Sequence, residues 1–556
     1  MRSTFLRASL LVPALTATSA CTTDDPDQSS TSAISDADES VVLLDQGWSP
    51  ELRSRFYTTT QGSRMLPYDW FLALERPTSR QKLRAASNMR RMGFLVDDRT
   101  ADNPDRLPVG FAKDVHPTRG ASVGLTCAAC HTGQLEYHGT QVRIDGGQSM
   151  VDLEAFQDEL LASLNATLAD ANKFSRFAAD VLADPSEAAS TGLRAEMTAV
   201  RDWWAARITR SRGLSPHGPS RTDAFTIIGN EVACKLLDIP ANCNVAFAPT
   251  QFPFLWNTPD FDWVQYNSSV HNPLGRNVGE VTGVFAELGF AANGTLDSTA
   301  NIDNLYVLEE TLKSLRAPSW PEHILGPIDH ELAATGEEIF VAQCASCHTE
   351  DPQPRTAPNR FGMTFAKVNF ATPLAVLGTD RSAALAFATR RALPGPFAPT
   401  FAAAGLIGPD GKVPLPALLN VATGSIIQKF FAANAFPTLK QLQYIGFRES
   451  LSPSTAQLTT YKARPLNGIA FTPPYLHNGS VASIYELLLP AAQRMPAFEV
   501  GSKAYDPVVL GYSTARTAHS VAFDTTEVGN ANSGHEFGTS LDHAARMALI
   551  EYLKTL

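Results

Sequence analysis

Two short segments of this chain combine cysteine and histidine at a spacing that could hold a redox cofactor. Residues 127–131 and 344–348 share the pattern Cys-x-x-Cys-His. Two thiols separated by two residues can reach the two vinyl groups of one haem as thioethers, and the adjacent imidazole then binds the iron as its proximal ligand. The alternatives are a thioredoxin-like redox pair and a zinc site, which needs further ligands. We therefore predict two covalently bound haem c groups, one on Cys127, Cys130 and His131 and one on Cys344, Cys347 and His348.

The ligand on the other face of each iron decides what a haem can do. An iron with protein ligands on both faces passes electrons, whereas an open or displaceable position admits O2 or peroxide. The second half of the chain offers His477, His535 and His543 as sixth ligands. His535 is preferred because its flanking glycines, Gly534 and Gly538, would let the backbone approach a haem face closely. His477 is the alternative ligand, and a surface or core role remains open for each histidine.

The two halves of the chain correspond beyond the motifs, which indicates an internal repeat. The segment Trp263–Val270 follows the first motif as Tyr475–Val481 follows the second, and Tyr266 takes the place of His477. The first half thus lacks a comparable histidine, and we expect an open or weakly ligated iron at His131. The residues that could still fill this position are His116, His138 and Met150.

Three segments of the chain resemble the bacterial dihaem cytochrome c peroxidase superfamily: Gly124–Gly133, Pro465–Val481 and Gly534–Thr539. Its members include dihaem peroxidases, the dihaem enzyme that matures a tryptophan-derived quinone, and rubber oxygenases that cleave polyisoprene with O2. The chain length and the segment Arg221–Asn230 favour the rubber-oxygenase-like branch. The resemblance implies a reactive first haem, an electron-transferring second haem, a small redox protein as electron donor and, as in some relatives, a Ca2+ ion between the domains.

Further side chains are candidates for the chemistry at the reactive haem. Cleaving peroxide or steering O2 benefits from an acid/base group that moves a proton between the two oxygens. Related peroxidases place a Glu shortly after the Trp that Trp263 matches, so the resemblance indicates Glu280, with an ion pair to Arg276 or a surface position as the alternative. Trp256 and Trp263 could carry an electron between the haems or belong to the core. A hydrocarbon pocket, or simply helix core, is expected from Ala224, Phe225, Ile227 and Ile228.

The N-terminal residues predict export. A basic start, the apolar run Ala8–Ala17 and small residues before Cys21 form a signal peptide over residues 1–21. Cys21 carries a lipid if this is a lipoprotein signal, and ordinary cleavage nearby is the alternative. Residues 22–45 would then be a disordered tether. The expected location is the periplasm, the outer membrane by a lipid tether, or the outside of a bacterial cell.

Composition narrows the partners and the compartment. The net charge is -11, and no Lys/Arg-rich run could follow a phosphate backbone, so nucleic acid is not expected as a partner. Outside the motifs and Cys21, only Cys234 and Cys243 remain. In an oxidising compartment these two are expected to form a disulfide, the alternative being two buried thiols.

Helical periodicity dominates the sequence, for example from Leu153 to Leu168, whereas alternating strands are scarce. We therefore predict a mainly α protein with two cytochrome c-like haem domains in tandem and long loops. The N-terminal haem domain, with the reactive haem and a helical insertion, covers residues 46–327, and the C-terminal cytochrome c domain covers 328–556. In the latter, Gly336, Phe340 and Tyr552 resemble the close contact between the first and last helices of small cytochromes c. Three functions compete: a dihaem peroxidase, a dihaem oxygenase acting on an apolar substrate, and an electron carrier without catalysis.

Overall fold

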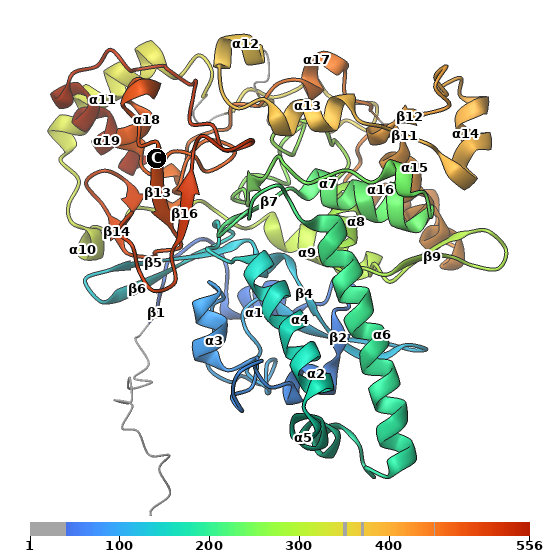
Figure 1. Ribbon diagram of the computed structural model, residues 1–556. Helices are drawn as coiled ribbons and strands as arrows, with labels where there is room; N and C mark the ends of the chain where they lie inside the picture. Colours follow the sequence, from blue (N-terminus) through green and yellow to red (C-terminus); the bar gives the residue numbers. More distant parts are fainter. Residues whose placement is uncertain (1–40, 349–352, 369–371, 450) are drawn as a thin grey trace, which may run out of the picture. The chain divides into compact units, whose positions relative to one another are not determined.

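Several small sheets accompany the helices in this fold, in contrast to the mainly α architecture that the sequence predicts (Figure 1). The computed structural model describes residues 41–348, 353–368, 372–449 and 451–556. Helix accounts for 41% and strand for 14% of the chain, so the expected mainly α class with two tandem cytochrome domains is wrong and the fold is mixed. The described chain belongs to one compact unit, Ser40–Leu556.

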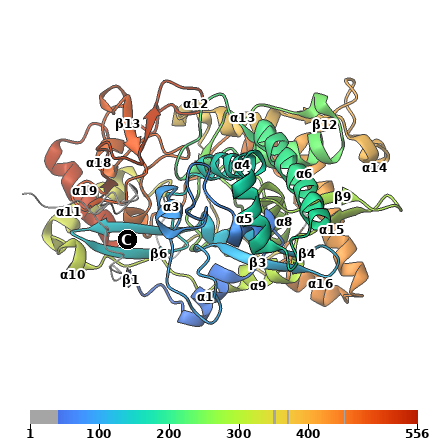
Figure 2. The ribbon, with the colours of Figure 1, turned by 60° about the horizontal axis from the view of Figure 1, so that its bottom comes forward.

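Two β-hairpins flank the first Cys-x-x-Cys-His motif. Strands β3 (Phe111–His116) and β4 (Gly120–Leu125) precede the motif, and β5 (Thr132–Tyr137) and β6 (Thr140–Asp145) follow it. Figure 2 shows the two hairpins extending in opposite directions. They are completed into three-stranded sheets by β2 (Leu66–Pro67), in the order β2-β4-β3, and by β1 (Val41–Leu43), in the order β1-β6-β5.

The strand signal here is short. From Gln141 to Asp145 the sequence of β6 alternates between polar and apolar side chains, but the run covers only five residues, and its polar side chains are buried as well. The turn between β5 and β6 consists of His138 and Gly139, which have φ values of 48° and 80°. Such left-handed pairs form two-residue hairpin turns, in which Asn-Gly is the usual sequence signal. A histidine in the first position hides that signal.

The first residues that the structure describes lie inside the segment expected to be a tether. Strand β1 pairs in parallel with β6, with Val41 opposite Gln141. The folded unit therefore includes the last residues of the range 22–45, while residues 1–40 lie outside the described residues. Among the described helices, none combines the length and apolar character that crossing a membrane requires.

The remaining strands are short antiparallel pairs that fasten loops together. They are β7 (Arg221–Thr222) with β8 (Thr250–Gln251), β9 (Leu288–Phe290) with β10 (Leu296–Ser298), β11 (Arg391–Ala392) with β12 (Val413–Pro414), β13 (Ala497–Val500) with β16 (Val521–Asp524), and β14 (Tyr505–Asp506) with β15 (Gly511–Tyr512).

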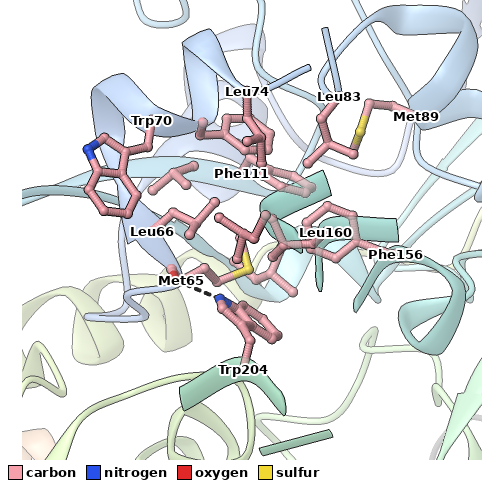
Figure 3. Packing of buried hydrophobic residues seen from close by; sticks show 14 of the residues in the cluster. Met65, Leu66, Trp70, Leu74, Leu83, Met89, Phe111, Phe156, Leu160 and Trp204 are labelled. Carbon is pink, nitrogen blue, oxygen red and sulfur yellow. Dashed lines mark hydrogen bonds between the residues drawn. The ribbon is translucent and has the colours of Figure 1, made fainter. Parts of the chain in front are cut away.

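The largest apolar core lies between the first hairpin and a group of helices (Figure 3). The expected periodicity from Leu153 to Leu168 is confirmed by α4 (Leu153–Ala169), which buries Phe156 and Leu160 in this core. The Trp204 indole of α6 (Glu187–Ser211) donates a hydrogen bond of 3.2 Å to the Met65 carbonyl, directly before β2. This bond holds α6 against the sheet that contains the hairpin. Besides α4 and α6, the helices of this region are α1 (Pro50–Thr58), α2 (Tyr68–Ala73), α3 (Ala86–Arg91) and α5 (Ala171–Val181).

The remaining helices belong to the middle and the C-terminal part of the chain. The middle contains α7 (Ala224–Gly229), α8 (Pro273–Gly283), α9 (Ile302–Leu312) and α10 (Glu322–Leu325), with a π-helical segment η2 (Asn230–Leu236) directly after α7. After the second motif follow α12 (Leu374–Leu377), α13 (Ser382–Thr389), α14 (Ala398–Ala403), α15 (Leu415–Ala433), α16 (Thr438–Tyr444), α17 (Thr455–Leu458) and α18 (Ile484–Leu487).

Helices α11 (His330–Gln343) and α19 (His543–Thr555) pack side by side at the expected glycine and aromatic contact (Figure 1). A Cβ atom added to Gly336 would lie 2.0 Å from the Ala548 carbonyl oxygen. The rings of Phe340 and Tyr552 pack with centroids 5.2 Å apart. Only glycine permits this close approach of the two helix backbones, so the predicted crossing is confirmed.

The backbone also confirms the internal repeat. Residues 211 positions apart share rare left-handed conformations: Gln265 and Leu476 have φ values of 68° and 64°, and Ser268 and Gly479 have 53° and 74°. Each repeat closes the same loop by a bridge between its ends, Val264 with Val270 in the first and Tyr475 with Val481 in the second. Such agreement at sterically costly positions indicates one loop structure used twice.

Gly336→Ala should destabilise the protein by about 1–3 kcal/mol, because the added methyl group forces α11 and α19 apart. Chemical denaturation followed by circular dichroism measures this difference. Gly192→Ala in α6 is the matched control, since its added Cβ meets no atom within 4 Å. The control should be neutral or stabilising by up to about 1 kcal/mol. Equal stability of the two variants would contradict the close crossing.

Candidate functional site

The first motif lines a large cavity. Cys127 lies in the short helix η1 (Cys127–Ala129), between β4 and β5, and Cys130 and His131 follow it. All three side chains border about 1580 Å³ of empty space, part of it open to solvent. Neither cysteine takes part in a disulfide, so both sulfur atoms remain available for thioether bonds.

The second motif lines a second cavity of similar size. Cys344 caps the C-terminus of α11, and Cys347 and His348 follow in the next turn. These residues border about 1650 Å³ of empty space. Cys344 and Cys347 take part in no disulfide either. Each of the two predicted haem motifs thus adjoins a cavity.

Each motif histidine is held by one backbone carbonyl. Nδ1 of His131 lies 2.7 Å from the Pro253 oxygen, and Nδ1 of His348 lies 2.7 Å from the Arg464 oxygen. Burial lowers the pKa of His131 to about 4 and also lowers the pKa of His348. Each ring is therefore a neutral imidazole that donates from Nδ1, which leaves Nε2 as a metal ligand. This arrangement fits a proximal haem ligand.

A second imidazole lies opposite His348. The rings of His348 and His535 have centroids 6.1 Å apart, and both border the second cavity. Two imidazoles that bind one metal from opposite sides, each nitrogen about 2.1 Å away, place their centroids roughly 6 Å apart. Nδ1 of His535 is buried without a hydrogen-bond partner, and burial lowers the pKa of this ring to about 4. The pair therefore fits a metal between its two rings.

The other two candidate ligands of the second half, His477 and His543, have different surroundings. His477 borders the same cavity, but its ring stacks on Tyr461 at a centroid distance of 3.9 Å. His543 lies at the start of α19 and pairs with the Tyr485 hydroxyl at 3.0 Å. The glycine expected to let the backbone approach a haem, Gly534, instead lies against Gly378 and Thr379. This contact fixes the loop that carries His535, whose amide donates to the Leu377 carbonyl at 2.7 Å.

The first cavity differs from the second in its lining. Among the described residues that border it, His131 is the one histidine, and none is a methionine. His116 ends β3, His138 lies in the hairpin turn after β5, and Met150 is buried elsewhere. None of these three borders the cavity. No described side chain there corresponds to His535.

Glu280, on α8, borders the first cavity. Its side chain keeps 41% of its surface accessible, on the side that faces the cavity, and Gln265 donates to its carboxylate at 2.9 Å. Arg276 lies 3.8 Å away but is paired primarily with buried Glu309. Desolvation raises the pKa of Glu280, which Arg276 and Gln265 only partly offset. The residue is thus a carboxyl group on the cavity wall whose pKa lies above its usual value.

The two predicted tryptophans lie away from the cavities. Trp256 is completely buried, stacks on Phe254 at 4.5 Å and donates to the Asn467 carbonyl at 2.8 Å. Trp263 packs against His271, and neither indole borders either cavity. The residues that border both cavities are instead Gln251, Pro253, Tyr266, Lys462 and Arg464. Tyr266 could have been predicted from the repeat, because Tyr266 is the counterpart of His477. Nothing in the sequence singled out Lys462 and Arg464.

The apolar wall of the first cavity includes the expected hydrocarbon-pocket residues. Ala224, Phe225, Ile227 and Ile228 of α7 all border it. Phe225 stacks on Phe387 of α13 at 4.1 Å. Behind α7, the expected disulfide joins Cys234 of η2 to Cys243 and is confirmed. No group of three or more His, Cys, Asp or Glu side chains in the described chain could hold a further metal ion, so we assign no Ca2+ site.

The motifs, the cavities and the helix contact define a cytochrome c-like protein that carries covalent haem c. Residues 460–499 match the family model described as "RoxA-like, cytochrome c-like". Over 93% of its length the chain is 32% identical to "Uncharacterized protein y4iJ" of Sinorhizobium fredii, 94% of which is covered, and it belongs to the same family. "Uncharacterized protein y4iM" of the same organism is 24% identical over 55% of the chain and 64% of that protein.

Removing the disulfide should loosen the segment behind α7. The double variant Cys234→Ala, Cys243→Ala removes the bond between two cysteines that are nine positions apart in the sequence. The expected loss is about 2–3 kcal/mol of unfolding free energy on the loop-entropy estimate. Urea denaturation of the oxidised protein and the double variant measures it. A reductant should lower the stability of the parent protein by the same amount and leave the variant unaffected, and an insensitive parent would contradict the bond.

Proposed function

We propose that the chain is an exported oxidoreductase that uses the first cavity to activate peroxide or O2 and the second to relay electrons. The observation that carries this proposal is the unequal lining of the two cavities. His535 faces His348 across the second cavity, whereas the described lining of the first offers no such partner to His131. A haem iron with an open face binds a small oxidant, and one with two imidazoles transfers electrons.

The chain's own residues have separable tasks in the first cavity. The Pro253 carbonyl orients His131, and Gln265 orients Glu280. Glu280 borders this cavity and has a raised pKa, so it is our candidate for moving a proton to and from a bound oxidant. The largely apolar walls restrict water, which strengthens these interactions.

An oxygenase acting on an apolar substrate is the second candidate. The α7 residues that border the first cavity support it, because they would contact a hydrocarbon next to the reactive centre. The RoxA-like match in residues 460–499 favours the same branch of the superfamily. Polyisoprene is the apolar substrate to be tried first. A pure electron carrier is disfavoured because it requires a second protein ligand at both irons.

Export and an electron donor complete the proposal. The disulfide between Cys234 and Cys243 supports an oxidising compartment such as the periplasm or the cell exterior. Phe537, on the wall of the second cavity, is 38% exposed, so this cavity reaches the surface. A small redox protein could transfer an electron to the second haem there.

Electron paramagnetic resonance of the haem-loaded protein tests the assignment of the two irons. We expect one low-spin and one high-spin centre. His535→Ala should convert the low-spin centre to high spin, because its second imidazole is lost. His477→Ala is the matched control in the same cavity and should keep the low-spin signal. Two low-spin irons that react with neither peroxide nor O2 would contradict the proposed function. If His477→Ala alone loses the low-spin signal, the sixth ligand is His477 and not His535.

Glu280→Gln should lower turnover by about 10²–10⁴-fold, the usual contribution of a positioned acid/base group. The assay is peroxide reduction with a reduced small cytochrome, run beside O2 uptake with polyisoprene. Glu310→Gln on α9 is the control, because Glu310 pairs with Lys313 and does not border the cavity. Full activity of Glu280→Gln in both assays would exclude this carboxyl from proton transfer.

A further inference from the structure

Two cationic side chains, Lys462 and Arg464, lie in the wall between the two cavities. Both residues border both cavities. Arg464 extends over the Phe254 ring at 3.5 Å and donates to the Phe254 carbonyl at 2.8 Å. The Lys462 ammonium lies 3.4 Å from the Trp263 carbonyl. The accessible parts of these side chains therefore face the space that the cofactors would fill.

Neither cation forms an ion pair with a carboxylate of the described residues. The other two arginines of the first cavity are neutralised: Arg207 pairs with Glu231 at 2.9 Å, and Arg276 pairs with Glu309. Nε of Arg464 is also buried without a hydrogen-bond partner.

Asp262 does not supply the missing charge. It forms no salt bridge with Lys462, and its carboxylate accepts hydrogen bonds from the amides of Trp263 and Val368. Arg464 and Arg276 each repel the lysine more strongly than Asp262 attracts it. An arginine cannot shed its proton in a protein, so filling the cavities would bury at least one uncompensated charge. Burying an unpaired ion costs several kcal/mol. The group that fills the cavities should therefore bring the negative charge.

We infer that Lys462 and Arg464 form a carboxylate-binding site, shared by the two cavities, that holds propionate groups of both haems. This inference rests on the proposed occupation of both cavities by haem c, and it does not depend on which iron reacts with an oxidant. The Arg464 guanidinium offers a planar fork that matches a carboxylate, and the Lys462 ammonium supplies a point charge.

The shared site has a consequence for electron transfer. A cation next to a haem stabilises the reduced state, which carries one positive charge less than the oxidised state. Since both residues border both cavities, loss of either should lower the reduction potentials of both haems together. A residue with only a local packing role would not move the two potentials in the same direction.

An optical redox titration of the full chain tests the site, after mass spectrometry has verified two porphyrins per chain. Lys462→Gln should shift the reduction equilibrium of both haems about tenfold toward the oxidised state, which is 59 mV for a one-electron couple. Lys462→Arg keeps the charge and should retain both potentials. Lys440→Gln removes an exposed lysine outside both cavities and controls for net charge.

Several outcomes would overturn the inference. Unchanged potentials in Lys462→Gln, or a shift confined to one haem, would do so. Loss of one iron's spin signal in that variant would make Lys462 an iron ligand instead. If Lys462→Gln does not accumulate with two haems, Arg464→Lys provides the test. This variant should shift the propionate bending modes in resonance Raman spectra, and an identical spectrum would refute the site. Two low-spin, unreactive irons would overturn the proposed function and leave this titration interpretable.

Discussion

The hydrogen bond from each motif histidine to a distant backbone carbonyl is the constraint around which both cavities are arranged. His131 and Pro253 are separated by 122 residues, and His348 and Arg464 by 116. A single carbonyl acceptor fixes the tautomer and the ring plane of an imidazole and makes its other nitrogen a better metal ligand. The loops that supply these carbonyls also form the wall between the cavities. The same loops therefore hold the two motif histidines and separate the two cavities.

Both halves use the same loop backbone, so the difference between the linings of the two cavities must come from other residues. The sequence suggested that Tyr266 in place of His477 leaves the first iron open. The structure gives another origin, because His477 stacks on Tyr461 while His535 faces His348. His535 lies beyond the repeated loop, in a segment held by the close approach of Gly534 to Gly378. The asymmetry thus arises from an addition to the second half and not from an exchange within the repeat.

What could be predicted from sequence follows the range of the interactions involved. The cofactor motifs depend on covalent spacing within five residues, and the α11–α19 crossing depends on a glycine where backbones meet, so both were predictable. The disulfide followed from the two cysteines left over. The strands beside the first motif were missed because the alternation in β6 covers only Gln141 to Asp145 and because the turn before it has His138 where Asn is the usual signal. The positions of Trp256 and Trp263 depend on tertiary packing, which residue type does not encode.

The shared wall also limits how far the two repeats can act as separate units. The first cavity takes Lys462 and Arg464 from the second half of the chain, and the second cavity takes Gln251 and Phe254 from the first. A boundary at residue 327 separates the repeats in sequence but cuts through the lining of both cavities. In an apolar surrounding, a change of charge in one cavity acts on the other with little screening. With the two haems that we propose, the interleaved lining would therefore couple the redox centres electrostatically, which two independent cytochrome domains joined by a linker could not achieve.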